Sequence, residues 1–97
     1  MWGNWLVANY KVLGIEEVHD YAGTTKKGCE KWGRGWRCNR DGKPGWKDWT
    51  ETANGGTPGG LWLHVELTPA MADDPQAFVA AWKSVPPPTP PAKTVTP

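Results

Sequence analysis

The chain has 97 residues and a formal net charge of +1 at pH 7, and eight of its residues are tryptophan. A chain of this length holds one domain, and because so small a domain buries only about two-thirds of its unfolded surface, little core is left to support a deep catalytic cleft. The near-neutral charge excludes a uniformly basic nucleic-acid-binding protein and an acidic mimic of nucleic acid.

The N-terminal residues 1–5 have neither the basic segment nor the apolar segment of a signal peptide. No apolar run in the chain approaches the roughly 20 residues that a membrane-spanning helix needs. We therefore expect a protein that is made in the cytoplasm and has no membrane partner. The single Phe and single Ile, beside many Gly, Pro and Ala residues, fit GC-rich codons, which indicates a GC-rich bacterium, or a virus that infects one, as the source.

Two elements are predicted in the first quarter of the chain. Residues 5–13 alternate between two faces, with Tyr10 and Val12 on one of them, and this period of two predicts a half-buried strand that Gly14 ends. Residues 15–22 repeat apolar side chains at helical spacing, which predicts a helix of two turns. A continued strand is the alternative for this second segment.

The middle of the chain, residues 24–60, is rich in glycine and polar residues and predicts hairpins and ordered loops. Its turn signals are at residues 33–35, 41–42 and 54–56. Residues 61–67 then alternate cleanly between apolar and other side chains, which predicts a strand. The core-facing side of this strand is expected to hold Leu61, Leu63, Val65 and Leu67, and its other side Trp62, His64 and Glu66.

A helix is predicted after residue 74. Asp74 can accept hydrogen bonds from the first free N–H groups, and Pro75 suits the first helical position. The apolar face of this helix is expected to consist of Phe78, Ala81, Trp82 and Val85. The helix must end before Pro86, because the Pro- and Thr-rich residues 86–97 predict an extended tail of polyproline type.

Together these elements predict an α+β fold with a small single domain over residues 1–85. We expect an antiparallel sheet with a central hairpin, and one C-terminal amphipathic helix that covers one face of the sheet. The extended Pro/Thr-rich tail over residues 86–97 follows this domain.

The ten residues from Cys29 to Cys38 are nearly symmetric about Arg34. On a hairpin, the tryptophans on either side of it, Trp32 and Trp36, would face each other, and the two cysteines would come close enough for a disulfide. Such a bond would stabilise the fold by about 2.5–3 kcal/mol. The hairpin would then act either as a staple for a segment with few aliphatic residues or as a presented loop with Arg34 at its tip.

Basic residues are concentrated between residues 26 and 47, where eight Lys and Arg side chains stand against two carboxylates. This segment therefore has a formal charge of +6, which leaves −5 on the remainder. Its tryptophans can stack on bases or sugars while its basic groups follow a phosphate backbone. The candidate binding residues are Trp32, Arg34, Trp36, Arg37, Trp46 and Trp49.

The remaining tryptophans are interpreted mainly as packing residues. Their positions in the expected strands and helix place Trp5, Trp62 and Trp82 on or near packing faces, so we expect at least two of them in the core. Trp2 is left unassigned.

A metal or catalytic site is not expected. A Cys2His2 set is present in His19, Cys29, Cys38 and His64, but the C-x8-C spacing lacks the close ligand pairs of zinc fingers. Neither histidine has a nucleophile nearby in the sequence. We therefore predict no enzyme, no metal and no cofactor.

The leading functional hypothesis is a small structural or accessory protein of a larger particle. A minor head or tail component of the virion of a bacteriophage of a GC-rich bacterium is the example that fits the charge segregation and the tail. It would contact protein partners in an oligomeric assembly through its Trp-rich basic loops and its Pro-rich tail. The alternatives are a soluble binding module for carbohydrate or single-stranded nucleic acid that uses exposed Trp residues, and a small inhibitor of a host protein.

Overall fold

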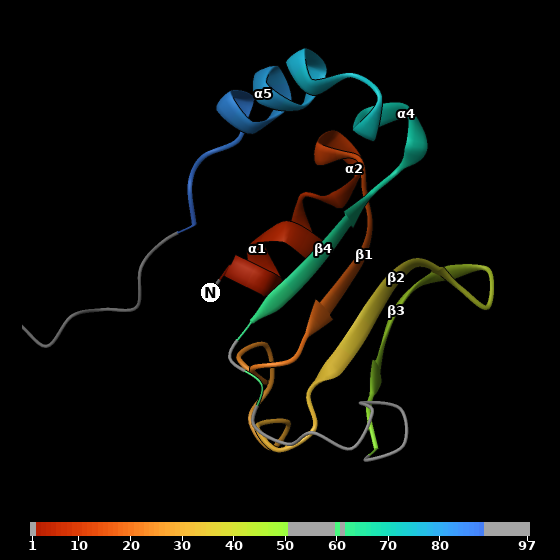
Figure 1. The fold of residues 1–97 in the computed structure, drawn as a ribbon, viewed down its shortest axis with the longest axis vertical. Helices are drawn as coiled ribbons and strands as arrows, with labels where there is room; N and C mark the ends of the chain where they lie inside the picture. The colour runs from red at the N-terminus through yellow and green to blue at the C-terminus, as the bar shows by residue number, and fades with distance from the viewer. Residues whose placement is uncertain (1, 51–59, 61, 89–97) are drawn as a thin grey trace, which may run out of the picture.

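A computed structural model gives the fold and describes residues 2–50, 60 and 62–88 (Figure 1). The predicted turn at 54–56, the core position predicted for Leu61 and most of the predicted tail therefore lie outside the described residues. Within the described part of the chain, no helix combines the length and the apolar character needed to cross a membrane.

Four antiparallel strands form a single sheet in the order β3-β2-β1-β4. The strands are β1 (Ile15–Asp20), β2 (Arg34–Arg40), β3 (Lys43–Asp48) and β4 (Leu63–Leu67). Helices α1, α2, α4 and α5 accompany the sheet, so the predicted α+β class with an antiparallel sheet is confirmed.

The predicted turn at Asp41 and Gly42 is confirmed, and it closes the β2–β3 hairpin. Arg40 pairs with Lys43, which leaves a loop of two residues, and both loop residues have a positive φ, 53° for Asp41 and 91° for Gly42. Positive φ at both positions defines the turn type whose twist matches that of the flanking strands. The hairpin therefore follows from the local preference of an Asp-Gly pair.

The strand predicted over residues 5–13 is wrong, because this segment forms α1 (Trp2–Ala8) and α2 (Tyr10–Leu13). Gly3, Leu6 and Leu13 are buried, and these positions repeat with the period of a helix. Gly14 ends α2 in the left-handed conformation, with φ at 65°. The alternation along the segment is therefore coincidental, and the helical period of the larger apolar residues determines the structure.

The helix predicted over residues 15–22 is wrong, and the alternative, a strand, is correct, because this segment forms β1. A β-bulge interrupts the pairing of β1 with β4 between Ile15 and Glu17. Because the bulge adds one residue, Ile15 and Val18 are both buried although they are three positions apart. A bulged strand thus reproduces the apolar spacing of a short helix.

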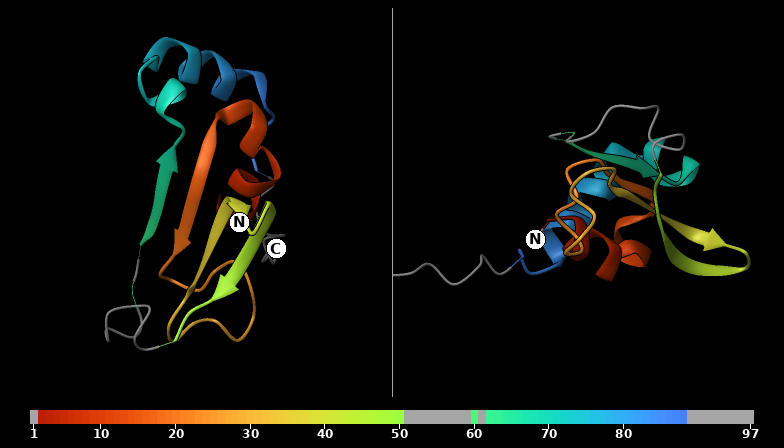
Figure 2. Two further views of the ribbon diagram at one scale, coloured as in Figure 1. Left: turned by 90° about the vertical axis from the view of Figure 1, so that its right-hand side faces the viewer. Right: turned by 90° about the horizontal axis from the view of Figure 1, so that it is seen from below.

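The core lies on one face of the sheet. Its buried hydrophobic residues are Leu6, Leu13, Ile15, Val18 and Trp36, and the apolar side chains of β4 (Leu63, Val65 and Leu67) pack against them. The predicted alternation of β4 is thereby confirmed, since His64 and Glu66 are exposed. Figure 2 shows the helices gathered beside the sheet, with the β2–β3 hairpin extending away from them.

The predicted C-terminal helix is confirmed as α5 (Pro75–Ser84), and a short helix that was not predicted, α4 (Pro69–Ala72), precedes it. The expectation that the C-terminal helix covers the sheet is wrong, because α5 packs mainly on α4 and α2 while α1 and α2 contact β1. The side chain of Asp74 accepts a hydrogen bond of 3.0 Å from the Ala77 backbone N–H, as expected for a helix cap. Partly buried residues of α5 and the residue that follows it pack on the core: Phe78, Ala81 and Val85.

Candidate functional site

The sheet face opposite the core, here called the polar face, carries charged and aromatic side chains. Val18 and Trp36 point into the core, so their neighbours Glu17, His19 and Arg37 point to the polar face. The register then aligns two rows across the strands. One row runs Glu66, Glu17, Arg37 and Gly45, and the other runs His64, His19, Gly35 and Lys47.

Aromatic rings form a continuous series along the polar face. Tyr21 has ring centroids 5.1 Å from Trp62 and 4.8 Å from Trp49. Trp49 lies 5.5 Å from His19, which in turn lies 5.2 Å from His64. Trp62 is 53% exposed, so one end of this aromatic series is open to a ligand.

A pocket of about 320 Å³ lies against these rings and is basic. Its lining consists of His19, Tyr21, Gly35, Arg37, Arg40, Lys47 and Trp49. Arg40 donates hydrogen bonds of 3.2 Å to the carbonyl oxygens of Gly45 and Gly35, and these bonds fix its guanidinium beside β2 and β3. The described residues that line the pocket thus supply three cations and no carboxylate.

Glu17 borders this pocket through its ion pair with Arg37. Glu17 Oε1 lies 3.1 Å from Arg37 Nε and 3.1 Å from His19 Nε2. Burial alone would raise the pKa of Glu17, but the His19 contact and the charge of Arg37 outweigh it and leave the pKa below its usual value. Glu17 is therefore ionised at neutral pH and holds Arg37 at the edge of the pocket.

Two of the six predicted binding residues, Arg37 and Trp49, lie at this pocket. Trp36 does not, because it is only 2% exposed and forms part of the core. Trp32 is half-buried in the loop before β2, where the Lys31 ammonium lies 5.1 Å from its ring centroid.

Arg34 and Trp46 act together as a structural pair away from the pocket. The guanidinium of Arg34 lies 3.9 Å from the ring centroid of Trp46, and Trp46 packs against the core. Arg34 also donates hydrogen bonds of 2.8 Å to the hydroxyl and the backbone carbonyl of Thr25. The prediction that Arg34 sits at the tip of a presented loop is therefore wrong.

The predicted hairpin between Cys29 and Cys38 does not form, and both thiols are free. Residues 34–40 continue as β2, and the chain reverses at Asp41 and Gly42 instead. Cys29 is buried, with its sulfur 3.5 Å from Asp48 Oδ1. Burial, followed by the Asp48 carboxylate, raises the pKa of the Cys29 thiol, so it stays protonated at neutral pH.

Four side chains of the pocket, those of His19, Tyr21, Arg40 and Lys47, are absent from the predicted binding residues, although Arg40 and Lys47 belong to the predicted basic segment. Trp62 was assigned to packing, although this ring is more than half exposed. The alternation of residues 61–67 was the signal for Trp62, since it placed that ring beside His64 and away from the apolar side. The residues of the pocket come together only through strand pairing, which no local sequence pattern reveals.

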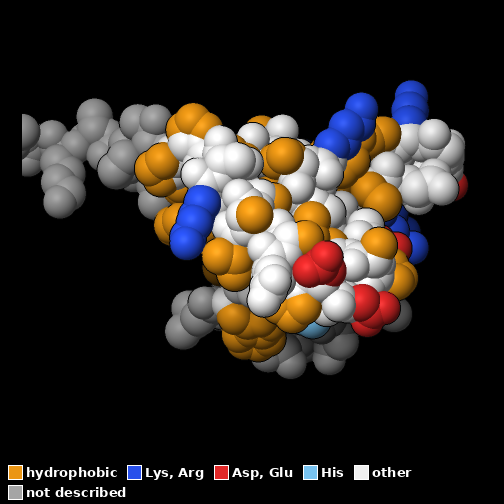
Figure 3. Space-filling view, turned by 90° about the horizontal axis from the view of Figure 1, so that it is seen from above, with side chains coloured by type: hydrophobic (Ala, Val, Ile, Leu, Met, Phe, Trp, Pro, Cys, Tyr) orange, Lys and Arg blue, Asp and Glu red, His pale blue; other side chains and the backbone are white. Residues whose placement is uncertain are grey.

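A second surface, here called the apolar patch, consists of Trp2, Trp5, Phe78, Val79 and Trp82. The rings of Trp2 and Trp82 stack at 5.8 Å, and Trp5 meets Trp82 edge-on at 5.0 Å. The Trp5 indole donates a 2.7 Å hydrogen bond to the Pro86 carbonyl, which secures the chain after α5. Figure 3 shows hydrophobic side chains spread over this end of the molecule.

A pocket of about 240 Å³ lies within the apolar patch and reaches Pro87 and Pro88. Trp82 is 38% exposed and Trp62 53% exposed, and Trp5 alone of the three packs against the core, so the prediction that at least two of them lie in the core is wrong. The indoles of the apolar patch pack mainly on one another.

No protein-family model, curated protein or solved structure matches this chain.

Proposed function

We propose that the protein is a non-catalytic binding module that holds a single-stranded nucleic acid on its polar face. The observation that carries this proposal is the meeting of an aromatic series and three cations at one pocket. Rings without cations would fit a neutral sugar equally well, and cations without rings would fit any polyanion. A strand of nucleotides offers both a base to stack and a phosphate to neutralise.

The arrangement of the groups supports an extended ligand. Trp49, Tyr21 and Trp62 follow one another in ring contact, with centroids 4.8 and 5.1 Å apart and planes tilted by 53° and 32°. Lys47 and Arg37 stand beside them on β3 and β2. Side chains on a four-stranded sheet that stack unpaired bases are a common means of binding single-stranded RNA. Aromatic rings on a sheet face can stack on unpaired bases, whereas the bases of a duplex are already stacked on one another.

The test is a titration of the intrinsic tryptophan fluorescence with an oligothymidylate at low and high salt. We expect quenching whose affinity falls with salt, because each phosphate contact contributes a slope of about −0.7 in log K against log salt for single strands. Lys47→Ala should reduce the slope by about that amount. Lys11→Ala, which removes an exposed lysine from the helix-covered side, should leave it unchanged.

The outcomes separate the candidates. Quenching by an oligosaccharide that is insensitive to salt would replace nucleic acid with carbohydrate as the ligand. If Lys47→Ala and Trp49→Ala bind oligothymidylate as well as the unmodified chain, the polar face is not the binding site. No response to either ligand would reject the binding module.

The apolar patch favours a second candidate function, a structural role in a larger particle such as a virion. Val79 is 50% exposed and Trp2 and Trp82 stack in the open, which leaves a hydrophobic surface for a neighbouring subunit. Concentration-dependent self-association of the purified protein, abolished by Val79→Glu, would support this role. If the protein is a monomer at every concentration and binds oligothymidylate in a salt-dependent way, the structural role is rejected and nucleic-acid binding stands.

A further inference from the structure

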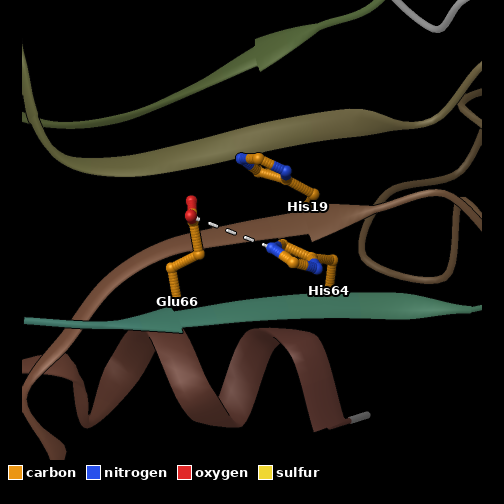
Figure 4. Close-up of side chains that lie close together, drawn as sticks. All are labelled: His19, His64 and Glu66. Carbon is orange, nitrogen blue, oxygen red and sulfur yellow. Dashed lines mark ion pairs between the residues drawn. The ribbon is translucent and has the colours of Figure 1, made fainter. Parts of the chain in front are cut away.

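A cluster of two imidazoles and a carboxylate lies on the polar face, on the strands β1 and β4. His19 and His64 are directly opposite each other in the antiparallel pairing, and their rings stack at 5.2 Å with an angle of 29°. Glu66 stands two residues along from His64, on the same side of β4, and its Oε1 lies 4.0 Å from His64 Nε2. One candidate ligand atom from each of the three lies within 4.8 Å of the others (Figure 4).

The pairing across the strands is unusual because like groups face like groups. Glu17 is opposite Glu66 in the register, and His19 is opposite His64. Cross-strand pairs of like charge destabilise a sheet, whereas pairs of opposite charge stabilise it. Arg37 offsets the charge of Glu17, at 3.1 Å. Glu66 lies within hydrogen-bonding reach of Glu17, and its ion-pair contact within the described residues is with His64, at 4.0 Å. A cation bound to Glu66 would offset the negative charge of this carboxylate opposite Glu17.

We propose that His19, His64 and Glu66 form a binding site for a divalent transition-metal ion, with zinc as the ion that their chemistry favours. Two imidazole nitrogens and one carboxylate are a known protein ligand set for zinc, with a fourth position left to solvent. The hard cations magnesium and calcium prefer oxygen ligands, so the two imidazoles select against them. Glu17 adds a second carboxylate at the edge of the site, 3.1 Å from His19 Nε2.

The side chains can reach the geometry that zinc requires. Zinc bonds of about 2.0–2.2 Å place tetrahedral ligand atoms about 3.4 Å apart. The present separations are at most 4.8 Å, so the ligand atoms must approach one another by up to about 1.4 Å. The side chains of His64 and Glu66 are 51% and 45% exposed, so they have room for the changes in side-chain torsion that would close this gap.

The experiment is a calorimetric titration of the full chain with zinc chloride, repeated with magnesium chloride, in the absence of nucleic acid. We expect one zinc per chain and no magnesium binding under the same conditions. His64→Ala and Glu66→Gln should each weaken zinc binding by about tenfold or more. Glu30→Gln, which changes an exposed carboxylate in the loop before β2, is the matched control and should bind zinc like the unmodified chain.

Cobalt provides a second readout, because the two free cysteines are the competing ligands. A cobalt complex of the proposed site has nitrogen and oxygen ligands, so its spectrum should show tetrahedral or five-coordinate d–d bands without a sulfur charge-transfer band. A sulfur band, zinc binding that survives His64→Ala, or no zinc binding by a folded chain would each overturn the proposal. Because no nucleic acid is present, these outcomes are independent of oligonucleotide binding.

Discussion

Asp20 and Thr25 are joined by two hydrogen bonds across the loop that leaves β1. Asp20 Oδ2 accepts from the Thr25 backbone N–H at 2.8 Å and from its hydroxyl at 2.6 Å. Asp20 is fully buried, and its other oxygen accepts from the Thr24 hydroxyl at 3.2 Å. Since Arg34 donates to Thr25 as well, this network connects the end of β1 to the start of β2.

Replacing Asp20 by Asn should destabilise the fold at neutral pH and change its response to acid. Burial alone would raise the pKa of Asp20, but the hydrogen bonds from Thr25 and Thr24 outweigh it and lower the pKa below the usual 3.8. A pKa that is lower in the folded state contributes stability that is complete above the unfolded value and is lost as pH falls through the folded value. The unfolding free energy of Asp20→Asn should therefore be about 1–3 kcal/mol lower at pH 7.

Urea denaturation between neutral pH and about pH 2 measures this effect. The loss of stability with acid should be smaller in Asp20→Asn than in the unmodified chain. Asp73→Asn, an exposed position between α4 and α5, is the control and should keep the original profile. Equal acid sensitivity in Asp20→Asn would contradict the role assigned to the network.

The position of the Trp49 ring should depend on the absence of a side chain at Gly35. A Cβ at Gly35 would lie 2.7 Å from Trp49 Cζ2 and 2.9 Å from its Nε1, so Gly35→Ala must displace the indole from β2. One stacked base contributes about 1–3 kcal/mol, and we expect oligothymidylate affinity to fall about tenfold. In Gly45→Ala the new Cβ would be 3.7 Å from the nearest Arg40 atom, and affinity should hold.

Circular dichroism would show whether Gly35→Ala keeps the fold, and the fluorescence emission maximum would report the new environment of Trp49. If both variants retain full affinity, the position of the Trp49 ring over β2 has no role in binding. If Gly45→Ala loses affinity equally, the effect belongs to the hairpin as a whole.

Prediction from the sequence succeeded where structure depends on neighbouring residues. The Asp41–Gly42 turn, the alternation of β4 and the Asp74 cap of α5 all follow from short-range preferences, and all three are present. Prediction failed where a distant contact decides the outcome. The bulge in β1 exists only in its pairing with β4, and its extra residue gave Ile15 and Val18 the spacing of a helix.

The candidate site shows the same division. Trp36 lies in the basic segment and Trp49 just after it, and no local pattern distinguishes the two. Strand register separates them, because Trp36 is paired with the buried Val18 while Trp49 follows the end of β3 beside Gly33. Trp62 directly precedes β4 and is 53% exposed, so the packing position predicted for it is wrong.

The two cysteines should be found as thiols. Cys29 is 7% exposed, and burial together with the Asp48 carboxylate raises the pKa of its thiol, so little nucleophilic thiolate is present at pH 8. In the purified chain, a thiol reagent should modify Cys29 slowly under native conditions and rapidly in denaturant. Mass spectrometry with and without reductant gives the count of free thiols. Equal masses are expected, and a difference of two hydrogens would indicate the disulfide that the structure lacks.

The tryptophans should divide sharply in their contributions to stability. Trp36 is 2% exposed and contacts the Tyr10 ring edge-on at 4.9 Å, so Trp36→Ala should lower the unfolding free energy by about 3–5 kcal/mol. Trp62 is 53% exposed and contacts Tyr21, and Trp62→Ala should cost about 1 kcal/mol or less.

If Trp36→Ala does not fold, Trp36→Phe keeps the comparison measurable, because it removes less volume from the same place. For ligand affinity, the proposed function predicts the opposite order of effects. Oligothymidylate affinity per folded molecule should be unchanged in Trp36→Phe, whose ring is on the core side, and reduced in Trp62→Ala, whose ring continues the aromatic series. Two variants that changed stability and affinity in parallel would contradict this separation, since the core and the polar face lie on opposite sides of the same strands.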